Sequence, residues 1–138
     1  MRSWKTPHSC TKKLRAAVIV CCWRFNDFVS LYIMSRHHFH GKLQELIERA
    51  ESGTAADVDF IFEHLTVHAD FAMTRFVDFA LGVVTSNVGF EQIRFYLFHG
   101  TQIQRNYASL YFNRLGEWDC VKEAFDQGLI DEVQAFAR

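Results

Sequence analysis

Proline, cysteine and long apolar runs are scarce in this sequence. The single proline is Pro7, so no later residue carries the fixed backbone angle that breaks helices. Cys120 is the only cysteine after Cys22, which leaves no framework of disulfide pairs and favours a reducing compartment. The apolar run from Ala16 to Trp23 is far shorter than the roughly 20 residues that cross a membrane. We therefore expect a cytoplasmic protein without a membrane partner.

Positive charge is also scarce after Ile33. Residues 1–33 carry six basic side chains and one acidic side chain, a net charge of +5, whereas residues 34–138 carry nine basic and fifteen acidic side chains, a net charge of −6. An acidic body lacks the clustered Lys and Arg that displace counterions from nucleic acid, so we expect no nucleic-acid partner. We interpret residues 1–33 as a basic N-terminal extension. It is an accessory helix, a targeting segment or an artefact of start-site assignment upstream of Met34.

Hydrophobic residues, by contrast, are abundant, and they recur at helical spacing. The chain is 49% hydrophobic and contains fourteen phenylalanines, enough to build a core of bulky side chains. No alternating strand pattern occurs, so the sequence predicts an all-α fold. The predicted helices are Lys42 to Glu51, Thr54 to Ala69, Asp70 to about Ser86, Phe90 to His99, Thr101 to Leu115, Glu117 to Gln127, and a last helix that begins after Asp131.

The sequence indicates both the start and the end of the helix between Gly100 and Gly116. Thr101 and Gln104 have the spacing of a capping box, and Gly116 supplies the left-handed residue that commonly ends a helix. More than half of this helix is apolar, which predicts neighbours on two sides. Its remaining stripe is polar and consists of Gln102, Arg105, Asn106, Ser109 and Asn113.

An internal repeat joins the later helices. The shift that aligns Met73 with Ile103 and Val133 also aligns Arg75 with Arg105. Pairs of short helices that recur at a period of roughly 30 residues are typical of an α-solenoid. The segments at 73–82 and 103–110 resemble the second helix of HEAT-like repeats, which reads Val-Arg-x-x-Ala-x-x-Ala-Leu-Gly. The resemblance spans residues 54–138.

The resemblance implies a short right-handed α-solenoid of about three helix pairs, with residues 34–138 as a single helical-repeat domain. An irregular helical bundle is the alternative, because it produces similar apolar spacing. HEAT-like proteins act mostly as binding scaffolds, so the resemblance also implies a protein partner.

Two histidines form the one arrangement that suggests catalysis. His64 and His68 are four residues apart in the predicted helix from Thr54 to Ala69, which places both on one face. Such a pair can hold a metal with further ligands, and a metal-dependent helical enzyme is therefore one alternative function. The HExxH order of metalloproteases is absent, and partly buried structural histidines explain the pair more simply.

These patterns favour a non-enzymatic protein–protein interaction module without a cofactor. The expected binding surface is the polar stripe Gln102, Arg105, Asn106, Ser109 and Asn113, together with Arg75. A small acidic inhibitor or immunity-type protein is a second alternative, since an acidic body can cover a basic active site. An open end of the stack also offers a homodimer contact, because its apolar surface otherwise meets water.

Overall fold

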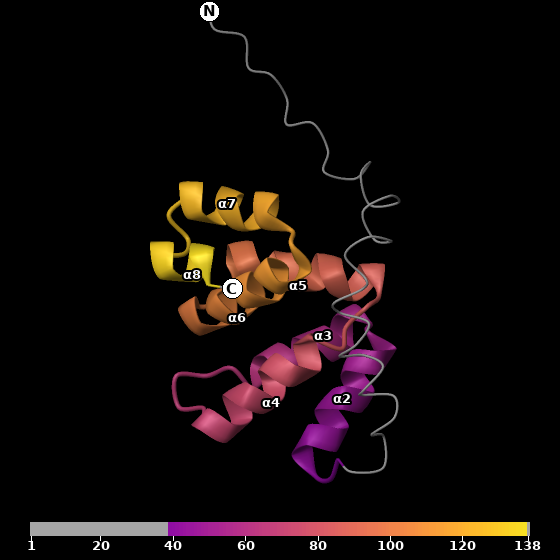
Figure 1. The fold of residues 1–138 in the computed structure, drawn as a ribbon. Coiled ribbons are helices and arrows are strands. Elements are labelled where there is room, and N and C mark those ends of the chain that lie inside the picture. Colours follow the sequence, from indigo (N-terminus) through magenta and orange to yellow (C-terminus); the bar gives the residue numbers. More distant parts are fainter. Residues whose placement is uncertain (1–38, 138) are drawn as a thin grey trace, which may run out of the picture. The chain divides into compact units, whose positions relative to one another are not determined.

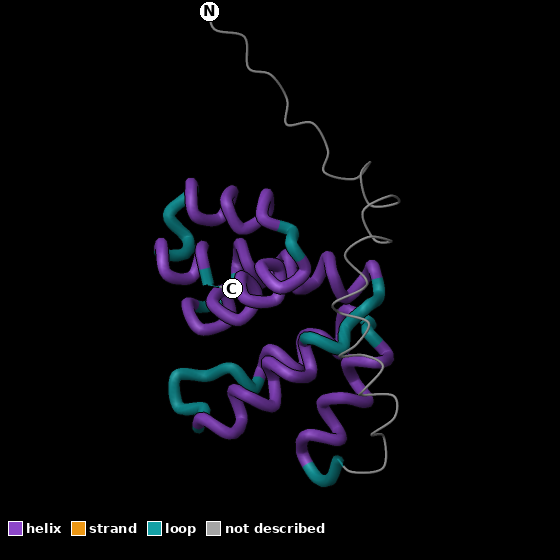
Figure 2. Tube along the Cα trace, viewed as in Figure 1, coloured by secondary structure: helices purple, strands orange, loops and turns teal. Residues whose placement is uncertain are grey.

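The computed structural model describes residues 39–137. The proposed extension at residues 1–33 and its relation to Met34 lie outside the described residues. Within the described range the chain forms helices and no strand, which confirms the all-α prediction (Figures 1 and 2). The helices are α2 (Lys42–Ser52), α3 (Ala55–Glu63), α4 (Phe71–Leu81), α5 (Asn87–His99), α6 (Gln102–Leu115), α7 (Trp118–Asp126) and α8 (Glu132–Phe136). None of the helices in this range has the length and apolar character needed to cross a membrane.

Side-chain caps begin most of these helices where the sequence predicts them. Asp70 accepts from the backbone N–H of Met73 at 2.7 Å, which confirms it as the N-cap of α4. The capping box of Thr101 and Gln104 is complete at the start of α6. Asp131 and Gln134 form a second complete capping box before α8. These caps satisfy N–H groups that the first helical turn would otherwise leave without partners.

Glycines in the left-handed region follow α2, α6 and α7, and the first two of these glycines are themselves the C-caps. Gly53 after α2 has φ 60°, and Gly116 after α6 has φ 78°. A side chain at either φ would be strained, so glycine ends both helices at little conformational cost. Both ends were predicted from the sequence.

The predicted helix from Thr54 to Ala69 is too long. α3 ends at Glu63, and residues 64–70 form a loop that leads to α4. His64 helps to end the helix, because its ring Nδ1 donates to the backbone carbonyl of Phe60 at 2.8 Å. Leu65 remains buried although it is no longer helical, whereas Val67 is 86% exposed.

The helices pack mainly against their immediate and next-but-one neighbours. α3 contacts α2, α4 and α5, and α6 contacts α4, α5, α7 and α8 (Figure 1). The α5–α6 contact is the most extensive of these. The core runs through all of the elements except α8, and its largest fully buried side chains include Phe62, Phe112, Leu46, Ile47, Ile61, Leu81, Ile93 and Leu97.

Candidate functional site

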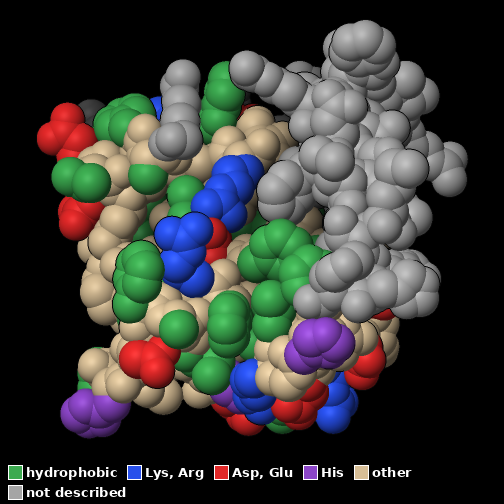
Figure 3. Space-filling view, turned by 60° about the horizontal axis from the view of Figure 1, so that its bottom comes forward, with side chains coloured by type: hydrophobic (Ala, Val, Ile, Leu, Met, Phe, Trp, Pro, Cys, Tyr) green, Lys and Arg blue, Asp and Glu red, His purple; other side chains and the backbone are tan. Residues whose placement is uncertain are grey.

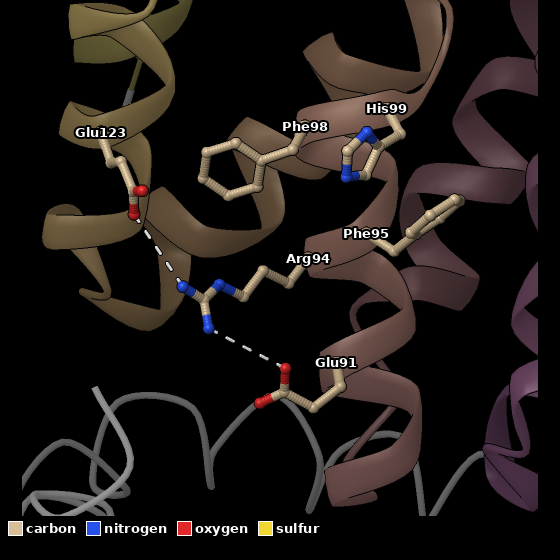
Figure 4. A pocket seen from close by; sticks show the side chains of 6 residues that line it. All are labelled: Glu91, Arg94, Phe95, Phe98, His99 and Glu123. Atoms are coloured by element: carbon tan, nitrogen blue, oxygen red, sulfur yellow. Dashed lines mark ion pairs between the residues drawn. The ribbon is translucent and has the colours of Figure 1, made fainter. Parts of the chain in front are cut away.

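A surface hollow of about 300 Å³ lies between α5 and α7. Its lining residues are Glu91, Arg94, Phe95, Phe98 and His99 from α5, and Glu123 from α7 (Figure 4). Hereafter these six residues are called the α5–α7 groove. The groove combines two aromatic rings with charged side chains of both signs, a composition that suits recognition of another molecule.

The helical period of α5 creates this groove. Gly89, Ile93 and Leu97 are buried and fix one side of the helix against the core. Glu91, Phe95 and His99 recur every four residues and therefore form one ridge on another side. Arg94 and Phe98 form a second ridge beside the first, nearer to α7 (Figure 4).

One guanidinium serves two carboxylates in the groove. Arg94 Nη1 lies 3.9 Å from Glu91 Oε2, and Arg94 Nη2 lies 3.9 Å from Glu123 Oε2. Both distances exceed the length of a hydrogen bond, so these are loose ion pairs. The Arg94 guanidinium also lies 5.9 Å from the centre of the Phe98 ring, within the range of a cation–π contact. Arg94 therefore links α5 to α7 without occupying the carboxylates fully.

Phe95 is the aromatic side chain that the groove leaves most open. It is 52% exposed, and its ring lies 4.8 Å from the ring of His99. Other large hydrophobic side chains are exposed elsewhere, and Figure 3 shows such groups between charged ones on the face that lies at the bottom of Figure 1. They include Val67, Phe71, Val88, Val133 and Phe136. Phe95 also lines a hollow, so its exposed ring lies beside further groups that a partner could contact.

A polar network fixes a neighbouring side of α5 to α3. Asp59 accepts hydrogen bonds from Gln92 Nε2 at 2.6 Å and from the Tyr96 hydroxyl at 2.9 Å. The Tyr96 ring stacks on Phe62 with their centres 4.0 Å apart. Partial burial and the bond to Asp59 raise the pKa of Tyr96 to about 12, so its hydroxyl remains a donor at neutral pH. The helix that carries Phe95 is thus held by charge-assisted hydrogen bonds and by packing.

The structure places the predicted polar stripe of α6 largely inside the molecule. Ser109 is 1% exposed and Asn113 is 7% exposed, so neither can contact a partner while α8 is in place. Asn113 Nδ2 donates to the Gln134 carbonyl at 3.0 Å, and Arg105 Nη1 donates to the Leu129 carbonyl at 3.1 Å. Part of the stripe is polar because Arg105 and Asn113 bind backbone carbonyls of the C-terminal segment. Sequence periodicity alone cannot distinguish such an internal polar stripe from an open binding surface.

The other members of the predicted surface do not form a common site. Gln102 is exposed, and its amide donates to Asn106 and to Gln134 within the chain. Arg75 is exposed on α4, and its guanidinium lies 5.5 Å from the ring centre of Phe71. Arg105 instead turns toward the loop before α8, so the two arginines that the repeat aligned have different surroundings.

The two candidate metal ligands also do not share a helical face. His64 and His68 both follow the end of α3, and the bond from His64 to Phe60 uses its Nδ1 proton. Across residues 39–137, no three side chains of His, Cys, Asp or Glu gather as a metal site would require. The predicted metal pair required a helix that continues through residue 68. Because α3 ends at Glu63, the four-residue spacing does not place His64 and His68 on one face.

The groove itself was not anticipated from the sequence. Ile93 and Leu97 hold one side of α5 in the core, whereas Phe95, two residues from each of them, is exposed. The surplus of aromatic residues on every side of α5 was the available signal, since one helix cannot bury all of them. The aromatic residues of α5 do not indicate how α7 packs, so they could not predict that Glu123 lies in the groove.

No protein-family model, curated protein or solved structure matches this chain. The resemblance to HEAT-like repeats consequently stays a prediction.

Proposed function

We propose that this chain is a non-enzymatic protein-interaction module, built as a short stack of helix pairs, and that the α5–α7 groove holds a segment of a partner protein. The observation that carries the proposal is the half-exposed Phe95 beside a hollow on a helix that is fixed from both sides. Aromatic residues, phenylalanine among them, are enriched in the buried cores of protein interfaces.

Two regularities support a stacked architecture. Alternate helices begin at regular intervals, and both series of N-caps advance by roughly 30 residues at each step, a period typical of helical repeats. The first series is Thr54, Ser86 and Glu117 before α3, α5 and α7, and the second is Asp70, Thr101 and Asp131 before α4, α6 and α8. Contacts between next-but-one helices join each of these series. Such packing is what a solenoid of helix pairs requires, since each pair covers the apolar side of the next.

A site-specific cross-link tests the proposal on the full chain. A photoreactive phenylalanine analogue replaces Phe95 in one variant, and replaces the exposed Val133 of α8 in the control variant. We expect irradiation in cells to join the chain to a defined second protein from position 95 and not from position 133. Equal labelling from both positions, or none from position 95, would contradict a groove-directed partner.

A further inference from the structure

The charges around Phe95 indicate what kind of partner the α5–α7 groove accepts, an inference that rests on the proposed function. Glu91 and Glu123 have side chains that are 57% and 53% exposed, whereas Arg94 between them is 30% exposed. The acidic groups are thus more accessible to a partner than the basic one. With one guanidinium for two carboxylates, these three side chains carry a net charge of −1.

Arg94 leaves both carboxylates with unused hydrogen-bonding capacity. Its two contacts are 3.9 Å long, beyond the range of about 2.7–3.2 Å in which N–H groups bond to oxygen. A carboxylate accepts several hydrogen bonds, so an incoming ammonium or guanidinium group can bond to Glu91 and Glu123 without displacing Arg94.

Carboxylates also lie on the other side of α5. Asp59 and Glu63 of α3 both act on the Tyr96 hydroxyl, which places their charges close to this helix. A segment that crosses α5 at Phe95 therefore meets negative charge from α3 on one side and from Glu91 and Glu123 on the other. An acidic segment, a nucleic acid or an anionic lipid surface would be repelled here.

We infer that the α5–α7 groove binds a peptide segment in which a lysine or arginine pairs with Glu91 and Glu123, while a neighbouring apolar side chain covers Phe95. The long stem of a basic side chain suits this arrangement, because its methylene groups pack on an aromatic ring while the charged head remains in water. The exposed ring supplies apolar contact area, and the two carboxylates supply orientation.

Synthetic peptides provide a direct test. Nine-residue peptides with an alanine and serine background carry leucine beside lysine or arginine, beside glutamine, or beside glutamate. Binding to the full chain is measured by fluorescence anisotropy at low and at high salt. We expect the basic peptides to bind most tightly, and we expect their advantage to fall as salt is added.

Two charge-removing variants make the test specific to the groove. The double variant Glu91→Gln with Glu123→Gln should weaken binding of the basic peptides about threefold to tenfold, the range expected for one or two part-exposed ion pairs. Glu132→Gln removes the same kind of charge from an exposed position on α8 and should leave binding unchanged.

Several results would overturn the inference. They are a lack of binding by the basic peptides, equal binding of basic and glutamine peptides, and equal losses from the groove variants and Glu132→Gln. Cross-links from position 95 that form only with a second copy of the chain would also overturn it. A heterologous cross-link at position 95 together with any peptide failure would keep the proposed function and reject only the basic partner.

Discussion

At the scale of single residues, Asp57 carries the most strongly perturbed charge in the described chain. It is 6% exposed at the start of α3 and accepts from Arg49 Nη1 at 2.8 Å and from the Thr54 hydroxyl at 2.6 Å. The pKa of Asp57 is well below its ordinary value, chiefly because of the bond from Arg49 and then the bond from Thr54. The negative charge also lies in the first turn of α3, where the helix dipole favours it.

Replacing Asp57 by asparagine should therefore lower the free energy of unfolding in a pH-dependent way. A lowered pKa in the folded state stabilises the protein above the ordinary carboxyl pKa of about 4, and this contribution is lost as the pH falls through and below that value. Urea denaturation at pH 7, 5 and 3 should show that the difference in the free energy of unfolding between the wild type and Asp57→Asn becomes smaller as the pH falls. Asp119→Asn, at an exposed site on α7, should show little change at any pH. A gap of constant size would mean that the charge of Asp57 contributes nothing.

The sequence predicted part of this arrangement. A threonine three residues before an aspartate indicates a helix start, and Thr54 does cap α3 by accepting from the Asp57 N–H at 3.2 Å. Arg49, on the preceding helix, could not be assigned as a partner, because the contact depends on the angle at which α2 meets α3.

At the scale of elements, the start of α5 lies against Gly53, the residue that ends α2. The Ser86 hydroxyl caps α5 by accepting from the Gly89 N–H at 2.9 Å and donates to the Gly53 carbonyl. Gly89 is buried in the first turn of α5 with no space for a side chain. A Cβ there would lie less than 3.0 Å from Val84 Cγ1 and from the Ser86 oxygen.

Gly89→Ala should consequently destabilise the protein despite the higher helix propensity of alanine. Propensity favours alanine by about 1 kcal/mol, whereas overpacking costs about 1–3 kcal/mol. Because two contacts would fall below 3.0 Å, the cost should lie in the upper part of that range, about 2–3 kcal/mol. We therefore expect a net loss of about 1–2 kcal/mol in the free energy of unfolding, measured by urea denaturation. Val88→Ala, one residue earlier at a 59% exposed position, is the matched control and should change stability by less than about 0.5 kcal/mol. A Gly89→Ala variant as stable as the wild type would contradict this prediction, because it would show that Val84 and Ser86 move away from the added Cβ without a cost in stability.

Helix starts were therefore more predictable than helix ends or packing. Caps are local, because a side chain and an N–H three residues later suffice, and the caps at Asp70, Thr101 and Asp131 follow that rule. The end of α3 was not predicted, because the buried Leu65 continues the apolar spacing after the chain has left the helix. Close packing beside Val84 and Gly53 explains the glycine at position 89, and this packing is not a local signal in the sequence.

The candidate groove was the least predictable element. The ridge of Glu91, Phe95 and His99 is implied by the period of α5, but which ridge stays open depends on where α3 and α7 lie. Tertiary packing alone brings Glu123 beside Arg94, because the whole of α6 separates the two residues in the sequence.

At the scale of the whole molecule, α2 and α8 are connected mainly through the helices between them. α2 packs against α3 and α4, whereas α8 packs against α6 and α7. Through the contacts that join these helices, a perturbation at one end reaches the other by way of α5 or α6. In a linear stack, stability is approximately a sum of units and of interfaces between neighbours, so local damage should remain partly local.

Asn113→Ala tests whether the described chain behaves as such a stack. The substitution removes the 3.0 Å bond from the buried Asn113 amide to the Gln134 carbonyl, and we expect it to cost about 1–2 kcal/mol. Native-state hydrogen exchange should then show faster exchange in α7 and α8, while amides of α2 and α3 retain their protection. Gln102→Ala removes exposed contacts from the same helix and should leave both regions unchanged. Loss of protection in all helices together would instead indicate that the described chain unfolds as a single cooperative unit, which contradicts the expectation for a stack.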